Sequence, residues 1–180
     1  TGTANVAVGH TSLAANTTGN YGTGIGYEAL TTNTTGGYNT GVGFWALKLN
    51  TTGGENTAIG VGALGANTTA SYNTAVGSGV LDANTTGANN TAMGFNALGA
   101  CTTGSESVAI GAGALDAVTT QGTNVAVGYS AATSLTTTGV TAIGYKAMES
   151  STTGYDTVAI GSNALKACTN GNENVAVGFN

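Results

Sequence analysis

Few residues in this chain are of types that carry out chemistry, and the most regular of them are asparagines that precede Thr-Thr. An Asn-Thr-Thr sequence is an acceptor for an N-linked glycan, in which a sugar is attached to the side-chain amide nitrogen. Five such acceptors share one slot of a repeating pattern: Asn16, Asn33, Asn50, Asn67 and Asn84. A sixth acceptor, Asn89-Asn90-Thr91, lies outside that slot, in a variable loop.

The five in-register asparagines also have a structural interpretation. In later repeats the same slot holds Cys101, Val118, Leu135, Ser151 and Cys168. Replacement by apolar residues indicates that the side chain points inward. Stacked asparagines would then form a ladder of amide hydrogen bonds, as they do in cross-β stacks. We expect this structural ladder at the five sites, keep glycosylation there as the alternative, and consider Asn89 the site more open to a glycan.

Catalytic and metal-binding groups are sparse. His10 is the only histidine, and no carboxylate pair recurs in a fixed relation, since Asp82 and Asp116 lie two repeats apart. The glycines of Gly22-x-Gly24-x-Gly26 lack the strand-then-helix context of a dinucleotide loop. A calcium-binding solenoid would need an aspartate in every repeat. We therefore expect no enzyme activity, no catalytic residue, no cofactor and no metal site.

The two cysteines, Cys101 and Cys168, occupy the same slot four repeats apart. If each repeat is one coil, stacking at about 4.8 Å per step places them roughly 19 Å apart. That separation is far beyond disulfide reach within one chain. We expect both to act as small buried hydrophobes, with an inter-chain role as the alternative.

The composition excludes several kinds of partner. Charged residues make up only 6% of the chain, and the net charge is −5 without a basic cluster, which argues against nucleic-acid binding. No apolar run approaches the roughly 18 residues of a membrane span, so we expect no membrane contact by this segment.

The strongest signal is a repeat built on the pentapeptide Asn-Val-Ala-Val-Gly, which stands at 5–9, 124–128 and 174–178. Its closing glycine recurs at 9, 26, 43, 60, 77, 94, 111, 128, 144, 161 and 178. The step is 17 residues, except for the 16 between Gly128 and Gly144. A fixed short period is typical of a repeat architecture. We expect one array over residues 1–180, forming a segment of a longer fibre.

Each repeat begins with a short strand. The residue before the closing glycine is apolar in every copy, Thr or Val lies two positions earlier, and Ala or Gly lies between them. This period-two alternation predicts a strand with one β-branched face and one face of Ala and Gly. A face of such small residues usually lets another backbone or sheet come close.

A second apolar segment and a turn complete the repeat. Leucine stands four residues after the glycine in most copies, and Asn-Thr-Thr-Gly follows with residues typical of turns. Seventeen residues are too few for a pair of helices. The pattern predicts an all-β fold, a parallel β-solenoid of about 17 residues per coil and 10–11 coils, with a rod length of roughly 50 Å. Charges in the remaining slots are expected to face water.

The pentapeptide and the string Asn-Thr-Ala-Met-Gly-Phe-Asn-Ala-Leu at 90–98 resemble known repeats. They are similar to the YadA-like head repeats of trimeric autotransporter adhesins and to repeats of bacterial and phage tail-fibre-domain proteins. The resemblance covers the whole chain, although those heads run a few residues shorter per coil. It implies a left-handed β-roll, a homotrimer, and an extracellular location on a cell surface or virion fibre, where the segment serves attachment to a host surface or matrix or forms a filament.

Self-association is expected on physical grounds as well. A single narrow coil buries a thin core, so we expect the Ala and Gly face, including Ala109 and Ala126, to pack against other copies. A homotrimer is the main hypothesis, and a filament of single solenoids competes with it. The alternative function is an ice-binding β-solenoid that presents columns of threonine. Against it, the two residues of a Thr-Thr pair on a strand would point to different sides.

Overall fold

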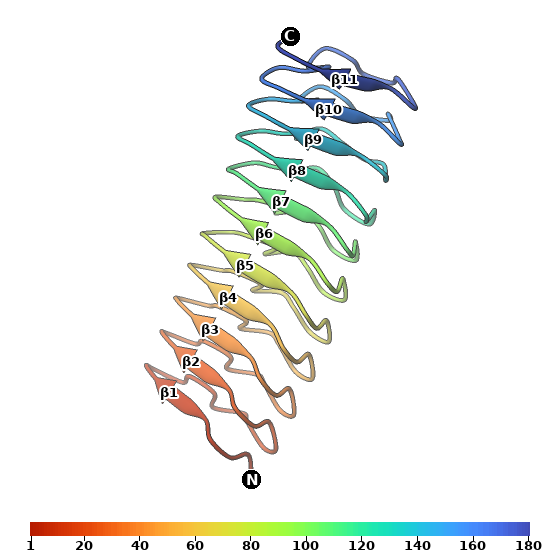
Figure 1. Cartoon of the computed structure of the whole chain (residues 1–180). Helices are drawn as coiled ribbons and strands as arrows, with labels where there is room; N and C mark the ends of the chain where they lie inside the picture. The colour runs from red at the N-terminus through yellow and green to blue at the C-terminus, as the bar shows by residue number, and fades with distance from the viewer.

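The computed structural model describes all residues, Thr1–Asn180, and contains one parallel sheet of 11 strands with no helix. The strands are β1 (Val6–Val8), β2 (Thr23–Ile25), β3 (Thr40–Val42), β4 (Thr57–Ile59), β5 (Thr74–Val76), β6 (Thr91–Met93), β7 (Val108–Ile110), β8 (Val125–Val127), β9 (Thr141–Ile143), β10 (Val158–Ile160) and β11 (Val175–Val177). Each strand pairs only with the strands before and after it in the chain. The coils stack into a rod with the termini at opposite ends (Figure 1). The prediction of a parallel β-solenoid with about 17 residues per coil is confirmed.

The register places equivalent residues of successive coils side by side. Ala58 lies opposite Ala75, and the same holds for every pair of neighbouring strands. The short 16-residue step does not disturb this order, because Val127 still pairs with Ile143. The missing residue is taken from the loop before β9, so the sheet continues unbroken.

The core lies between the middle residues of the strands and the leucines that follow each closing glycine. Ala58 and Leu64 are both fully buried, as are their counterparts in the inner coils. At Gly41, which takes the alanine slot of β3, an added Cβ would lie 3.3 Å from Leu30 Cγ. The leucine therefore fills the space over the small strand residue, inside one chain.

This packing overturns one expectation about assembly. Ala109 and Ala126 are completely buried by their own chain. The hypothesis that the Ala and Gly face forms an intermolecular interface is therefore wrong. The residues are small because two layers of a narrow coil meet there, with leucine supplying most of the volume. The β-branched face of the strands is the one that points outward.

The second apolar segment is not a strand but a series of turns. Its leucines adopt positive φ, for example 53° at Leu30, 51° at Leu47 and 51° at Leu64. Bulky residues are uncommon in this left-handed region. Hydrogen bonds between coils hold them there, since the Leu47 amide donates to the Ala63 carbonyl at 3.0 Å. The turn directs each leucine into the core.

The closing glycines are required by backbone geometry. Gly60 has φ +134°, and an added Cβ would lie 2.2 Å from the carbonyl oxygen of Gly77 in the next coil. No side chain fits between two backbones that approach so closely. Contacts of this kind with the next coil occur at the closing glycines from Gly9 to Gly161, while Gly178, at the end of the stack, has none.

Candidate functional site

The five in-register asparagines lie in a continuous hydrogen-bonded ladder. After Asn16, each side-chain amide donates to the Oδ1 of the asparagine one coil earlier: Asn33 to Asn16 at 3.1 Å, Asn50 to Asn33 at 2.8 Å, Asn67 to Asn50 at 2.8 Å and Asn84 to Asn67 at 3.0 Å. Each Nδ2 of these four also donates to a carbonyl three residues later. Four of the five are buried, and Asn16 is half-buried. A glycan on these nitrogens would have to replace the ladder hydrogen bonds.

The ladder ends where cysteine takes over the slot. The Oδ1 of Asn84 is buried without a hydrogen-bond partner, because the next coil offers Cys101. The Cys101 thiol is buried and donates to the Gly104 carbonyl at 3.6 Å, and burial raises its pKa. Cys168 is half-buried, and neither cysteine forms a disulfide. Cys101 is therefore the small buried residue that the sequence predicts, whereas Cys168, in the last complete coil, is only half-buried.

A second amide ladder was missed from the sequence. The first asparagine of the pentapeptide is buried at Asn39, Asn56, Asn73 and Asn90. The backbone amide of Asn56 donates to Asn39 Oδ1 at 3.0 Å, and its Nδ2 donates to the Ala70 carbonyl at 2.9 Å. The recurrence of asparagine in that slot was the available signal.

Asn89 lies apart from both ladders. It is exposed, has φ 60°, and occupies the turn just before β6. Its side chain takes part in neither ladder, so a glycan there would not have to replace ladder hydrogen bonds. Glycosylation at this residue stays a prediction.

The outward side of the sheet is uncharged along its whole length. We call the first and third residues of strands β1–β11 the outer sheet face. Its third-residue column contains Ile59, 41% exposed, Met93, 42% exposed, and Ile110, 38% exposed. No Asp, Glu, Lys or Arg occurs at either position in any strand. This face is a continuous strip of Val, Ile, Met and Thr.

Aromatic rings follow the closing glycines at the end of the strands. The rings of Tyr27 and Phe44 stack with centroids 5.2 Å apart and an interplanar angle of 11°. His10 stacks on Tyr27 at 5.1 Å, and Tyr129 and Tyr145 form a separate pair at 5.6 Å. The single histidine is thus exposed and part of a surface stack.

The turn segments on the other side of the core hold the ion pairs. Lys48 Nζ lies 2.7 Å from Glu28, and Lys146 lies 2.9 Å from Glu149, which also contacts Lys166 at 3.5 Å. The Lys48 ammonium lowers the pKa of Glu28 by hydrogen bonding. The two sides of the solenoid therefore differ in character, one uncharged and one carrying paired charges.

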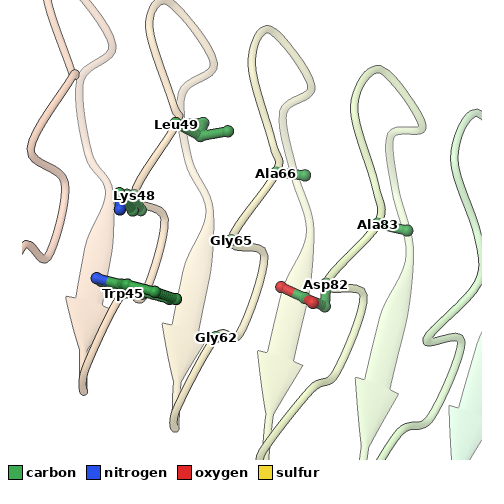
Figure 2. A pocket seen from close by; sticks show the side chains of 8 residues that line it. All are labelled: Trp45, Lys48, Leu49, Gly62, Gly65, Ala66, Asp82 and Ala83. Atoms are coloured by element: carbon green, nitrogen blue, oxygen red, sulfur yellow. The ribbon is translucent and has the colours of Figure 1, made fainter.

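The same turn segments line an open hollow of about 420 Å³. Figure 2 shows Trp45 and Asp82 at its two ends, with Gly62 and Gly65 between them. Lys48 Nζ lies 4.1 Å from the Trp45 ring centroid, and the indole is 42% exposed. Asp82 is exposed as a residue, but partial desolvation of its carboxylate, which has no hydrogen-bond or ion-pair partner, raises its pKa.

No group of three or more His, Cys, Asp or Glu side chains is arranged to hold a metal ion. The structure has no helix with the length and apolar character needed to cross a bilayer. Comparison of the chain with family models, curated proteins and solved structures gives no match.

Proposed function

We propose that this chain is a structural, non-enzymatic repeat segment of an extracellular fibre or adhesin, displayed on a cell surface or virion, and that it self-associates through the outer sheet face. The observation that carries the proposal is the uncharged, largely apolar strip that extends over β1–β11. Its residues include Ile25, Ile59, Met93, Ile110, Ile143 and Ile160, all exposed in the isolated chain.

The size of this strip suits an interface. Three residues at about 3.3 Å and ten steps of about 4.8 Å give a flat area of roughly 10 by 50 Å. A standard interface buries about 800 Å² per partner, so the strip would supply more than half of one. Exposed apolar patches of several hundred Å² usually mark association sites.

A second copy of the chain is the partner that this strip fits best. Two such strips carry no charge, so they approach without the desolvation of buried ions. Both are equally long and flat, and their strands repeat with the same spacing. Three chains around a common axis, each presenting its outer sheet face inward, form the homotrimer that the family resemblance implies. A filament of laterally paired solenoids uses the same face.

Sedimentation equilibrium tests this proposal. A double variant, Ile59→Glu with Ile110→Glu, places charges on the strip without touching the core, and Tyr72→Glu is the control on an exposed loop residue. We expect the unmodified chain and Tyr72→Glu to sediment as a multiple of the chain mass, and the double variant as a monomer with an unchanged circular dichroism spectrum. A monomeric unmodified chain, or a double variant that assembles normally, would overturn the proposal.

Ice binding is a second candidate function, and one observation favours it. The outer sheet face presents threonine as the first strand residue in β2 to β6 and β9, each followed by an outward apolar residue. In the Thr-Thr turns, by contrast, the first threonine is engaged inside the stack, as when Thr51 Oγ1 donates to the Thr68 carbonyl at 3.0 Å. Thermal hysteresis by the unmodified chain, lost in the Ile59→Glu and Ile110→Glu variant, would favour ice binding over attachment.

A further inference from the structure

The geometry points to a saccharide-binding subsite in the hollow between Trp45 and Asp82, on the side of the solenoid opposite the outer sheet face. The inference rests on the attachment function proposed above and names the ligand class that this segment would hold. The hollow of about 420 Å³ is within the usual range for small-molecule sites.

The floor of the hollow is open because two slots lack side chains. Gly62 and Gly65 stand where the preceding coil has Trp45 and Lys48. An added Cβ on Gly65 would lie 2.6 Å from Asp82 Oδ1. Gly65 thus makes room for the carboxylate to lie over the floor, and Trp45 forms the facing wall (Figure 2).

The polar groups around the floor select a neutral ligand. The Lys48 ammonium lies over the Trp45 ring and is held by Glu28 at 2.7 Å, so a cationic ligand would meet a like charge there. An anionic ligand would meet Asp82 at the other end. Phe44 lies 4.6 Å and the Lys48 ammonium 4.1 Å from the centre of the Trp45 ring, so the indole offers the hollow its exposed apolar edge. The C–H groups of a sugar pack against that edge, and its hydroxyl groups donate to Asp82 and accept from Lys48. A saccharide therefore satisfies both ends without adding charge.

A second hollow farther along the rod has side chains of the same kinds in a different arrangement, since Gly113 and Asp116 belong to one coil whereas Gly62 and Asp82 belong to successive coils. This second hollow, of about 220 Å³, contains Phe95, Gly113, Asp116 and Tyr129. Gly113 occupies the slot of Gly62, and Asp116 occupies the slot of Asp82. Burial raises the pKa of Asp116 as it does that of Asp82. Two aromatic and carboxylate sites on one side of the rod suit an extended oligosaccharide.

Trp45 is the only tryptophan, so its fluorescence reports on this hollow directly. The full chain is titrated with cellotriose, N,N′,N″-triacetylchitotriose and maltotriose, and with choline and acetate as charged probes. We expect a saturable fluorescence change with at least one trisaccharide in the millimolar range, matched by saturation-transfer signals from the same sugar. Absence of saturation with all three, or saturation only with choline or acetate, would overturn the inference.

Three variants make the test specific. Gly62→Asn fills the floor while keeping the fold, because Asn96 and Asn163 already occupy this slot with φ of 53° and 59°. Gly62→Asn and Asp82→Asn should each weaken binding by about tenfold or more, and the loop variant Tyr72→Ala should not. Unchanged binding by both hollow variants would overturn the site.

The ligand site and the assembly face are tested separately. The Ile59→Glu and Ile110→Glu variant should keep sugar binding if the hollow acts within one chain. Loss of assembly with retained binding in this variant supports both proposals. Normal assembly of the unmodified chain without any sugar binding would overturn the ligand site alone.

Discussion

Asn50 donates one amide hydrogen to Asn33 Oδ1 at 2.8 Å and the other to the Gly53 carbonyl at 2.9 Å. Its own Oδ1 accepts from Asn67, also at 2.8 Å. A residue in the middle of the ladder therefore connects three coils. Asn84, at the end, donates in the same way, but its Oδ1 is buried without a partner.

This difference predicts unequal costs for equal substitutions. Asn50→Val leaves Asn33 Oδ1 without its hydrogen-bond donor, and Asn84 Oδ1 remains without a partner as before. Asn84→Val removes the unpaired Oδ1 of Asn84 but leaves Asn67 Oδ1 without a donor. The number of buried oxygens without a hydrogen bond therefore stays the same. We expect Asn50→Val to be more destabilising by about 1–3 kcal/mol, the cost of one buried unsatisfied group. Urea midpoints followed by circular dichroism measure this, and equal midpoints would contradict the ladder's role.

The closing glycine predicts a large local effect. Gly60→Ala would force a Cβ to 2.2 Å from the Gly77 carbonyl oxygen at φ +134°, where strain alone costs about 1–3 kcal/mol. Gly37→Ala is the control, since its nearest contact would be 3.2 Å and its φ lies outside the left-handed range. We expect a much lower thermal midpoint for Gly60→Ala than for Gly37→Ala. Similar midpoints would show that the coils do not approach as described.

The buried position of Ala109 predicts a stability effect rather than an assembly effect. Ala109→Leu overpacks the space beneath the leucine layer and should cost about 1–3 kcal/mol. The neighbouring Ile110→Leu, on the outer sheet face, should leave the denaturation midpoint nearly unchanged. An Ala109→Leu variant with unaltered stability and lost assembly would restore the small-residue face as an interface.

The raised pKa values of Asp82 and Asp116 predict a pH dependence. Because burial raises these pKa values in the folded state, the stability that their protonated forms contribute is fully present below the ordinary aspartate pKa. It is lost as the pH rises through the raised folded-state pKa. A double variant, Asp82→Asn with Asp116→Asn, should match the unmodified chain near pH 3 and exceed its thermal midpoint near pH 7. An equal difference at both pH values would contradict this sign.

The sequence was sufficient to locate the strands and the first ladder, because both depend on recurrence at a fixed slot. It could not show which side of the strand faces inward, since small residues fit a thin core as well as an interface between chains. The structure shows that Ala109 faces inward, because Leu115 and its equivalents fill the layer of the core opposite the strand alanines.

The other features missed from the sequence have physical reasons of their own. Leucine at positive φ, as at Leu64, is imposed by hydrogen bonds between coils and runs against the preference of the residue itself. The hollow beside Trp45 depends on glycine in two slots of the same coil, Gly62 and Gly65, a combination that no other coil has. A repeat pattern describes the residues that the coils share, so it does not reveal a hollow that depends on the residues of one coil.

Site-directed cross-linking tests the central claim, self-association through the outer sheet face, most directly. In a chain with Cys101→Ala and Cys168→Ala, a single cysteine is introduced either by Ile110→Cys, on that face, or by Asp116→Cys, on the opposite side. We expect oxidation to link Ile110→Cys chains to one another at micromolar concentration and to leave Asp116→Cys chains unlinked. Cross-links at Asp116→Cys with none at Ile110→Cys would contradict the proposed interface.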